Sequence, residues 1–476
     1  MLREKRSRLL RVAPWAIVAA LLAGGVGAAA APRYEIDLAV DWDSGAFAGS
    51  VAVTVENTGP APIGEVVFRL FPNDASLYGN AFLRVAEARL AEEMLEIYAS
   101  NDPTVLPVAL PFLLLPEQTA SLVLRFEGQA GSSPLYAAER VTGYGILTKN
   151  PQSLVLTAFY PILAVLDEEG WSLSPSCGIG DVLWGAAADY AVSVRVSDVV
   201  APAASGRLVA STAEEGRAVH RFVAESARDF SLVLTLGYET RELEASGKTL
   251  RAWFSPAASA AAERTLATAA EALSIYQERI GPLPRDEIDF VEVPLRRAAG
   301  VEFSGLILVS SSYVSRPFDT FYDIIVSHEL AHQWFYDVVG NDPASDPWLD
   351  EGLATYLSNV FLESARGDEV AAAEVLRWQR SYASALEAFP NLRVADPACR
   401  FPTSSAYSSV AYDTAAWFHH TIRHEIGDDA YFSALSSYYK GNAWQVASAD
   451  DLLCAFEAAC TCDLRELFET FGFAPE

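Results

Sequence analysis

The 476-residue chain has few histidines, few cysteines and little positive charge. It carries six histidines, five cysteines, and 34 lysine and arginine residues against 62 aspartate and glutamate residues, for a formal net charge of −28. A surface this acidic repels nucleic acid and anionic membranes, so neither is an expected partner. The charge either favours basic peptides or serves solubility alone, and solubility is the simpler interpretation.

The cysteines have no metal-site spacing, and we interpret them as structural. Their odd number leaves at least one unpaired in an exported chain. Cys460 and Cys462 are predicted to lie too close in sequence to bridge each other, whereas either one has Cys454 or Cys399 as a partner within reach. The pairing and the oligomeric state are left open.

Long apolar runs are missing after residue 31, so no transmembrane span is expected there. Residues 1–31 resemble a secretory signal, with a basic start, an apolar core from Val12 to Leu22, and small residues at the end. Cleavage between Ala29 and Ala31 predicts an exported, periplasmic or extracellular protein. The alternative is an uncleaved membrane anchor, because the apolar run approaches spanning length, and only then is the membrane a partner.

The hydrophobic pattern divides the remaining chain into two parts. Residues 32–245 alternate apolar and polar positions, which predicts a large antiparallel β-sheet domain. Residues 246–476 are mainly helical in pattern, so the fold class is predicted to be α+β. The clearest single elements are strands at Ser50–Val55, Tyr190–Val196, Ile288–Val293 and Leu306–Ser310, and a helix from Ser255 to Ile280.

The most informative segment is His328-Glu329-Leu330-Ala331-His332. Positions i and i+4 lie on one face of a helix, so both histidines can bind one metal ion. Glu329 lies one step around the helix, where it can reach a water on that metal. Because histidine is scarce in this chain, a chance match on a charged surface helix is the weaker interpretation.

Glu351 follows His332 after eighteen intervening residues and is the expected third ligand. Asp346 and Pro347 predict the start of a second helix with Glu351 in its first turn. A carboxylate stabilised only by the helix N-terminus is the alternative. Two imidazoles and one carboxylate, with a fourth position open to water, make a catalytic site for one Zn²⁺ ion.

The helix that carries the two histidines is predicted to begin at Asp319 or Thr320, after Pro317, and to stop at Gly340. Apolar residues recur at helical spacing as far as Val338. Both histidines are therefore expected in the middle of a buried, rigid helix, which can hold a metal site in its geometry.

At these residues the chain resembles the M1 family of zinc aminopeptidases, in the gluzincin group. Pro347–Tyr356 is similar to the family segment W-L-N-E-G-F-A-T-Y, with Asp350 where asparagine is usual. That change is expected to alter zinc affinity without abolishing binding. The resemblance covers about residues 33–476 and implies a thermolysin-like catalytic domain. It implies a short bacterial-type member without the C-terminal helical domain of many members, and hence an open site or one covered by a partner subunit.

Gly300–Gly305 is similar to the family's exopeptidase motif, written G-x-M-E-N or G-M-E-Y-P-G. The resemblance implies that Glu302 grips the free amino terminus of the substrate, while the backbone at Gly300 pairs with the peptide like an added strand. Val301 and Phe303 depart from the commonest motif, so an endopeptidase remains open. Without the resemblance, Glu302 is interpreted as an exposed carboxylate on an edge strand.

Ala406–Asp413 resembles the family segment whose second tyrosine stabilises the oxyanion, a role that falls to Tyr412, with Tyr407 as the fallback. Half-buried core is the alternative for both tyrosines. Three further histidines follow, and packed or solvated side chains are expected there rather than a second metal site; these are His419, His420 and His424.

The implied function is an exported zinc metallopeptidase that hydrolyses the N-terminal bond of peptides, with a zinc-activated water and Glu329 as general base. A zinc endopeptidase and a catalytically inactive peptide-binding scaffold are the alternatives, and a small-molecule hydrolase is more remote. The intact ligand and catalytic positions argue against the inactive scaffold. The preferred side chain and the natural substrate are not predicted.

Overall fold

The computed structural model describes residues 31–132, 143–175, 177–181, 183–214 and 216–473. The predicted signal or anchor therefore lies outside the described residues, apart from its last residue. In the described ranges, no helix combines the length and the apolar character needed to cross a bilayer.

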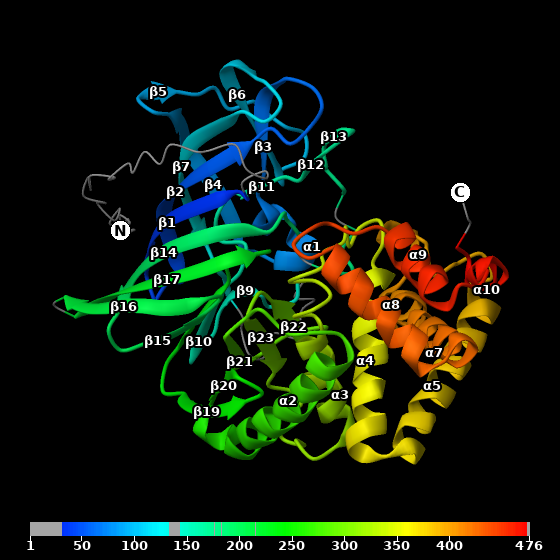
Figure 1. Ribbon diagram of the computed structural model, residues 1–476. Coiled ribbons are helices and arrows are strands. Elements are labelled where there is room, and N and C mark those ends of the chain that lie inside the picture. The colour runs from blue at the N-terminus through cyan, green and yellow to red at the C-terminus, as the bar shows by residue number, and fades with distance from the viewer. Residues whose placement is uncertain (1–30, 133–142, 176, 182, 215, 474–476) are drawn as a thin grey trace. The chain divides into compact units, whose positions relative to one another are not determined.

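The first half of the chain consists almost entirely of strands (Figure 1). The strands are β1 (Arg33–Val40), β2 (Ala46–Glu56), β3 (Ile63–Arg69), β4 (Phe82–Leu90), β5 (Glu93–Met94), β6 (Val105–Leu114), β7 (Thr119–Gln129), β8 (Gly131–Ser132), β9 (Leu147–Lys149), β10 (Ser153–Leu156), β11 (Ile162–Leu163), β12 (Leu166–Asp167), β13 (Gly170–Trp171), β14 (Ala188–Ser197), β15 (Ala201–Ala204), β16 (Arg207–Glu214), β17 (Arg217–Ala227) and β18 (Leu232–Thr235). A 3₁₀ turn (Phe71–Asn73) and the short helix α1 (Ala75–Tyr78) interrupt them.

The largest sheet has the strand order β16-β17-β14-β1-β2-β7-β4-β5. Its strands alternate buried and exposed residues, as the sequence predicts, because one face packs on the core. Neighbouring strands run antiparallel except β1 and β14, which are parallel, with Ile36 opposite Val192. The large antiparallel sheet expected from the sequence is thus present, with one parallel pair where β14 returns to β1 after a long crossover.

A further sheet joins this half to the helical half. It contains β19 (Glu239–Ala245), β20 (Lys248–Phe254), β21 (Glu287–Val293), β22 (Gly300–Phe303) and β23 (Leu306–Ser310), in the order β19-β20-β21-β23-β22. The expected division at residues 245 and 246 falls in the turn between β19 and β20, which pair directly. That division stays a prediction. In this sheet β22 is an edge strand, bonded only to β23 among the described strands.

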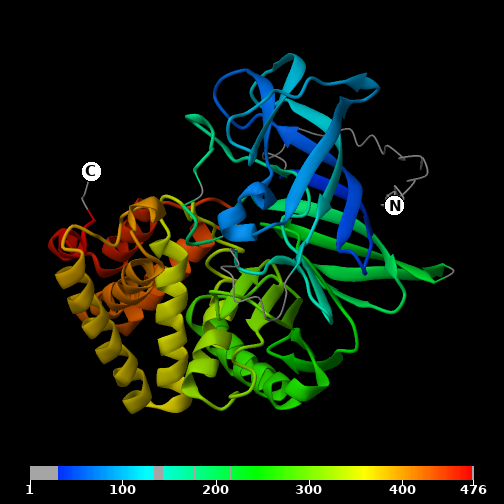
Figure 2. The same ribbon diagram turned by 180° about the vertical axis from the view of Figure 1, so that it is seen from behind.

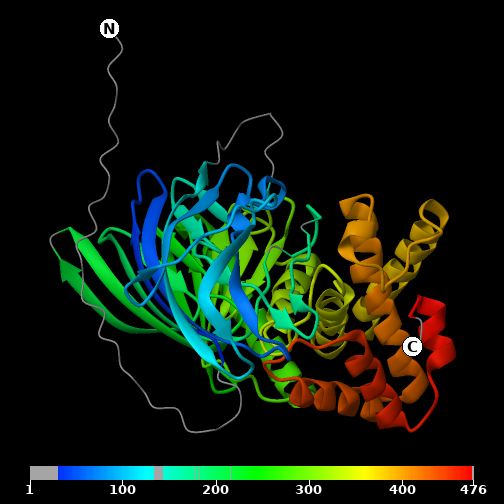
Figure 3. The ribbon, with the colours of Figure 1, turned by 90° about the horizontal axis from the view of Figure 1, so that it is seen from above.

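Helices make up most of the rest of the chain and lie beside the sheets in Figures 2 and 3. They are α2 (Ser259–Arg279), α3 (Thr320–Ala331), α4 (Trp348–Arg366), α5 (Asp368–Ala388), α6 (Ser404–Tyr407), α7 (Ala415–Ile426), α8 (Asp428–Gly441), α9 (Ala449–Cys460) and α10 (Arg465–Phe471), with a π-helical turn at Ser408–Thr414. A sheet-rich first half followed by a helical second half confirms the α+β prediction.

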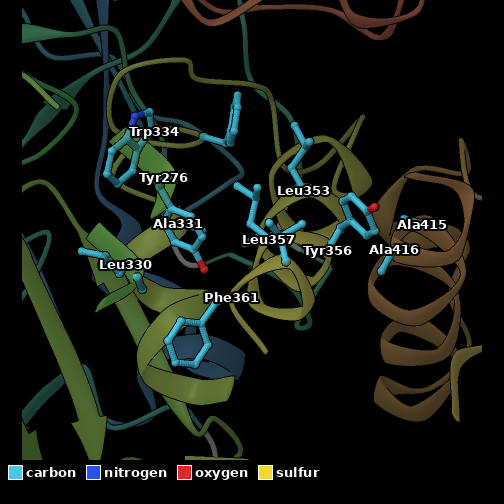
Figure 4. Packing of buried hydrophobic residues seen from close by; sticks show 14 of the residues in the cluster. Tyr276, Leu330, Ala331, Trp334, Leu353, Tyr356, Leu357, Phe361, Ala415 and Ala416 are labelled. Atoms are coloured by element: carbon cyan, nitrogen blue, oxygen red, sulfur yellow. The ribbon is translucent and has the colours of Figure 1, made fainter. Parts of the chain in front are cut away.

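Helix α4 is the centre of the helical half. Every residue from Trp348 to Leu362 is buried, as expected for a helix that is surrounded by others. Figure 4 shows Leu353, Tyr356 and Leu357 of α4 among side chains of its neighbours, including Ala415 and Ala416 of α7. This packing holds the first turn of α4, and with it Glu351, in a fixed place.

Helix α3 ends at Ala331, nine residues before the predicted stop at Gly340. The prediction fails because of Arg228, which directly follows β17. Its side chain binds the backbone carbonyls of the turn that follows α3. Its buried guanidinium donates hydrogen bonds to the carbonyl oxygens of Tyr336, Asp337 and Val338. The expectation that both histidines lie in the middle of the helix is therefore wrong, because His332 is the C-cap.

The cysteines also depart from the prediction. Cys177 is bonded to Cys399, and Cys460 is bonded to Cys462, while Cys454 is exposed and unpaired. Cys460 and Cys462 can bridge because Thr461, at the end of α9, adopts a left-handed backbone (φ 54°). That turn brings the two Cα atoms to 5.1 Å, within the range of disulfides. The expectation of one unpaired cysteine is confirmed.

Candidate active site

The three predicted metal ligands converge. The Nε2 atoms of His328 and His332 are 3.2 Å apart, and they lie 3.1 and 3.4 Å from Oε2 of Glu351. Burial acts to raise the pKa of Glu351, but the hydrogen bonds and charges of both histidines outweigh it and bring this pKa to about 2. An ionised carboxylate and two imidazole nitrogens therefore face one point.

These distances fit a zinc ion. Ligand atoms at about 2.0–2.1 Å around a tetrahedral zinc lie roughly 3.3 Å from one another. The observed triangle has that size, and its atoms are the nitrogen and oxygen donors that zinc prefers. His328, His332 and Glu351 can thus hold one zinc ion without a change of side-chain conformation.

Neighbouring groups orient both imidazoles. The Nδ1 atom of His332 is 3.0 Å from the carbonyl oxygen of Phe335, and Nδ1 of His328 is 3.4 Å from Oγ1 of Thr355. A bond from Nδ1–H leaves Nε2 free to bind metal. The turn that shortens α3 supplies the first of these acceptors, so the early end of the helix serves the site.

Glu329 lies one step around α3 from His328, and its carboxylate groups with His332 and Glu302. Its carboxylate is buried, and its Oε2 has no hydrogen-bond partner among the described residues. Burial and the nearby Glu302 raise the pKa of Glu329 well above the usual value. Gly300 makes room for this carboxylate, because a Cβ atom at Gly300 would lie 2.4 Å from Oε1 of Glu329. A carboxylate with an unused oxygen at this position can accept a proton from a reacting group.

Glu302 lies on β22 and is 8% exposed, so the interpretation as an exposed edge-strand carboxylate is wrong. It forms a second cluster with Glu329 and His332, in which one ligand atom from each lies within 4.8 Å of the others. Burial raises the pKa of Glu302 to about 7, although the charge of His332 acts against this. A cationic group is the natural partner for this pair of carboxylates.

Both tyrosines reach the site. The hydroxyl of Tyr412, on the π-helical turn, donates to Oε1 of Glu351, and its ring stacks on His328 with centroids 5.9 Å apart. Tyr407 is buried, and its hydroxyl has no hydrogen-bond partner among the described residues. The side chain of Tyr412 therefore lies against the three predicted metal ligands, and the ring of Tyr407 packs against that of Tyr412.

The three histidines that follow Tyr412 are buried to different degrees. His419 is fully buried, with its Nδ1 3.1 Å from the hydroxyl of Tyr431. His420 is partly buried and His424 is exposed. Within the described ranges, only the two clusters around His332 have the spacing of a metal site.

The site opens into a cavity of about 770 Å³. Its walls include four residues that sequence reasoning missed: Tyr144, Asp181, Arg297 and Thr355. Burial and the charge of Asp350, the residue that replaces the usual asparagine, raise the pKa of Asp181 well above its usual value. Tyr144, Asp181 and Arg297 lie on loops, where no periodic pattern marks a functional residue. Only Arg297 could have been found from the sequence, because it lies three residues before the motif that begins at Gly300.

Comparison with known proteins agrees with this geometry. The peptidase family M1 domain matches residues 264–471. Aminopeptidase 2 of Candida albicans is 25% identical over 234 residues, which are 46% of this chain and 25% of that protein. Aminopeptidase N of Streptomyces lividans is 26% identical over 200 residues, 40% of this chain and 23% of that protein. The chain thus matches about a quarter of the length of these relatives.

The fold also has solved counterparts. The M1 zinc metallopeptidase of Deinococcus radiodurans superposes with a TM-score of 0.69 at 21% identity, over 94% of this chain and 95% of that chain. This likeness concerns the fold, and the matched domain contains His328, His332 and Glu351 in zinc-binding geometry. Residues 264–471 thus match the peptidase family M1 domain, and the chain as a whole has the fold of an M1 zinc metallopeptidase.

Proposed function

We propose that this protein is a zinc aminopeptidase, which removes the first residue from peptides. The observation that carries the proposal is the pair of adjoining clusters, one suited to a metal ion and one suited to an ammonium group. The relatives named aminopeptidase support it, as does the Deinococcus radiodurans enzyme, a variant of which is solved with a Tyr-Ser-Ala substrate.

His328, His332 and Glu351 hold the zinc ion, which when bound supplies a Lewis acid to the reaction. Glu329 accepts a proton from the attacking water and passes it to the leaving amine. Its raised pKa suits both steps, because a carboxylate with a very low pKa returns a proton poorly. The Tyr412 hydroxyl donates a hydrogen bond to the developing oxyanion.

Glu302 restricts cleavage to the first peptide bond of the substrate. Its carboxylate is buried and faces the cavity beside Glu329. An ammonium group that binds there loses its hydration water and gains contacts with two carboxylates. A peptide whose terminal ammonium occupies this place has its first peptide bond beside Glu329. An acetylated amino terminus lacks the positive charge. It therefore cannot neutralise these two buried carboxylates, and the peptide should bind poorly.

The test uses the zinc-loaded protein with one peptide and its N-acetylated twin, with products followed by mass spectrometry. We expect stepwise loss of residues from the free peptide only. Internal cleavage of both peptides would make the protein an endopeptidase, the alternative that Val301 and Phe303 keep open. No cleavage of either, with zinc bound, would favour the inactive scaffold. The matched control is Glu329→Gln, which should retain zinc and release no product.

We also propose that the chain is exported. The basic and apolar sequence of residues 1–31 supports this, as do two disulfides in the described part of the chain, because disulfides persist in oxidising compartments. The test is the N-terminal mass of the full chain expressed in bacteria. A chain that starts after residues 29–31 in the periplasm or medium is expected, and an intact chain in the cytosol would contradict export.

A further inference from the structure

The cavity beside the metal ligands is lined by many carboxylates and by two arginines, Arg297 and Arg377. Arg377 is neutralised, since its Nε lies 2.7 Å from Glu374 and its Nη1 lies 2.9 Å from Asp413. Arg297 has no carboxylate within 4.0 Å among the described residues. It is the cavity's one described cation without an acidic partner.

The contacts of Arg297 leave most of its donors unused. Its Nη2 atom lies 3.1 Å from Oγ of Ser404 and 3.4 Å from the carbonyl oxygen of Gly178, both neutral acceptors. Its guanidinium stacks on the ring of Tyr144 at 5.3 Å. A guanidinium has five N–H donors, and stacking leaves its edge free to bind a planar anion.

The surroundings hold Arg297 in place. Its backbone is left-handed (φ 65°), a conformation that side chains other than glycine rarely adopt. The next-door Arg296 donates its backbone N–H to the carbonyl oxygen of Tyr144. The disulfide between Cys177 and Cys399 ties together the two segments that carry Gly178 and Ser404. The guanidinium therefore stands at a fixed point where three segments meet.

The direction of a bound peptide follows from β22. One edge of this strand is bonded to β23, and its residues Gly300 to Glu302 line the cavity. An ammonium at Glu302 and a scissile bond beside Glu329, which lies against Gly300, place the peptide antiparallel to β22. Its later residues then run from Gly300 past Ala299 and Ala298 toward Arg297.

Arg297 lies three positions before Gly300, so their Cα atoms are at most about 10 Å apart. An extended peptide covers that distance with its second or third residue after the cleaved bond. We propose that Arg297 binds a carboxylate of the substrate at this position. The carboxylate belongs either to the free C-terminus of a short peptide or to an acidic side chain, and this inference rests on the proposed aminopeptidase function.

The test compares Leu-Ala-Ala as a free acid with its C-terminal amide. Wild-type protein should release leucine from the acid with a kcat/KM at least about tenfold higher, as for a charge-assisted bidentate contact. Arg297→Gln should lose this preference by slowing on the acid alone, and Arg297→Lys should keep part of it. The control is Arg380→Gln, which removes an exposed arginine that does not line the cavity.

Amidated Leu-Ala-Glu distinguishes the two sources. Recovery of the high rate assigns the site to a side-chain carboxylate, and a low rate assigns it to the terminal carboxylate. Equal rates on acid and amide in the wild type, or an unchanged ratio in Arg297→Gln, would overturn the proposal. Equal slowing on both peptides would also overturn it, because a structural role has that effect. Failure of the aminopeptidase function itself is distinguishable, since no leucine is then released from any peptide.

Discussion

At the scale of single residues, the position of the Glu329 carboxylate depends on a glycine. Gly300 lies against the carboxylate of Glu329, and its backbone is not left-handed, so no turn requires glycine there. The space that a side chain would fill is the space that the carboxylate occupies. This close approach explains why the strand that carries Glu302 begins with a glycine.

Gly300→Ala should therefore inactivate the protein without unfolding it. The added Cβ would lie 2.4 Å from Oε1 of Glu329, and the carboxylate has to move away from the reacting water. A misplacement of this size costs about a hundredfold in rate. We expect that loss in kcat, with bound zinc and melting temperature close to wild type. Val301→Ala is the neighbouring control, and wild-type kcat in Gly300→Ala would contradict the role of the glycine.

His419 predicts a pH dependence of stability. Burial lowers its pKa to about 3 in the folded protein, whereas the unfolded value is about 6.5. The folded state thus binds fewer protons than the unfolded state between these values. The stability that neutral His419 contributes is complete above pH 6.5 and is lost as the pH falls toward 3.

The variant His419→Gln cannot titrate and should flatten the acid side of the stability curve. Each pH unit between 6.5 and 3 should cost the wild type up to about 1.4 kcal/mol more than the variant. Urea unfolding at a series of pH values measures this slope. The exposed His424 lies on the same helix, and His424→Gln is the control. Equal slopes in wild type and His419→Gln would contradict the prediction.

At the scale of elements, the end of α3 depends on a residue about a hundred positions away. Arg228 is buried at the end of β17 and binds the carbonyls of the turn after His332. The apolar pattern continues through this turn, so the sequence predicts a longer helix. The apolar pattern does not decide the end of the helix, because the buried guanidinium gives these carbonyls the hydrogen bonds that a further helical turn would give them.

Arg228→Met should unfold at lower urea concentration than the wild type. It leaves several buried carbonyls unpaired, a loss of about 3 kcal/mol or more. Because the turn supplies the Phe335 carbonyl that orients His332, zinc affinity should fall as well. Urea titration and zinc competition measure the two effects. The exposed Arg221 on the same strand provides the control Arg221→Met, and equal stability of both variants would refute this role for Arg228.

At the scale of the whole molecule, the two disulfides differ in what they join. Cys177 lies within the β-rich half, between β13 and β14, and Cys399 lies among the helices, with a sequence separation of 222 residues. Cys460 and Cys462 are two residues apart. A bond restricts the unfolded chain more as the loop grows longer, so only the first bond has a large effect on stability.

Cys399→Ser should lower the free energy of unfolding by about 4 kcal/mol, and Cys462→Ser by about 1 kcal/mol. Urea unfolding of both variants, without reductant, measures the difference. The short-loop variant is the matched control, because it also removes one disulfide and adds one free thiol to that of Cys454. Equal losses would show that loop closure does not explain the contribution of the long-range bond.

Local signals made the metal site predictable. His328, Glu329 and His332 lie within two turns of one helix, so their spacing alone sets their direction, and Glu351 follows in the first turn of the next helix. Glu302 and Tyr412 were predicted only from the resemblance to a family. Strand edges and irregular helical turns have no repeating sequence pattern that would mark such residues. Asp181 was not predicted by either route.

The sequence by itself predicted the grouping of His328, Glu329, His332 and Glu351, the α+β class and most element positions, because these depend on neighbours within a few turns of chain. Tertiary structure alone decided where α3 ends, which cysteines pair and what surrounds the metal ligands. Arg228, Cys177 and Arg297 act on segments about a hundred or more residues away. Such contacts form only when the whole chain is packed, so no local sequence pattern predicts them.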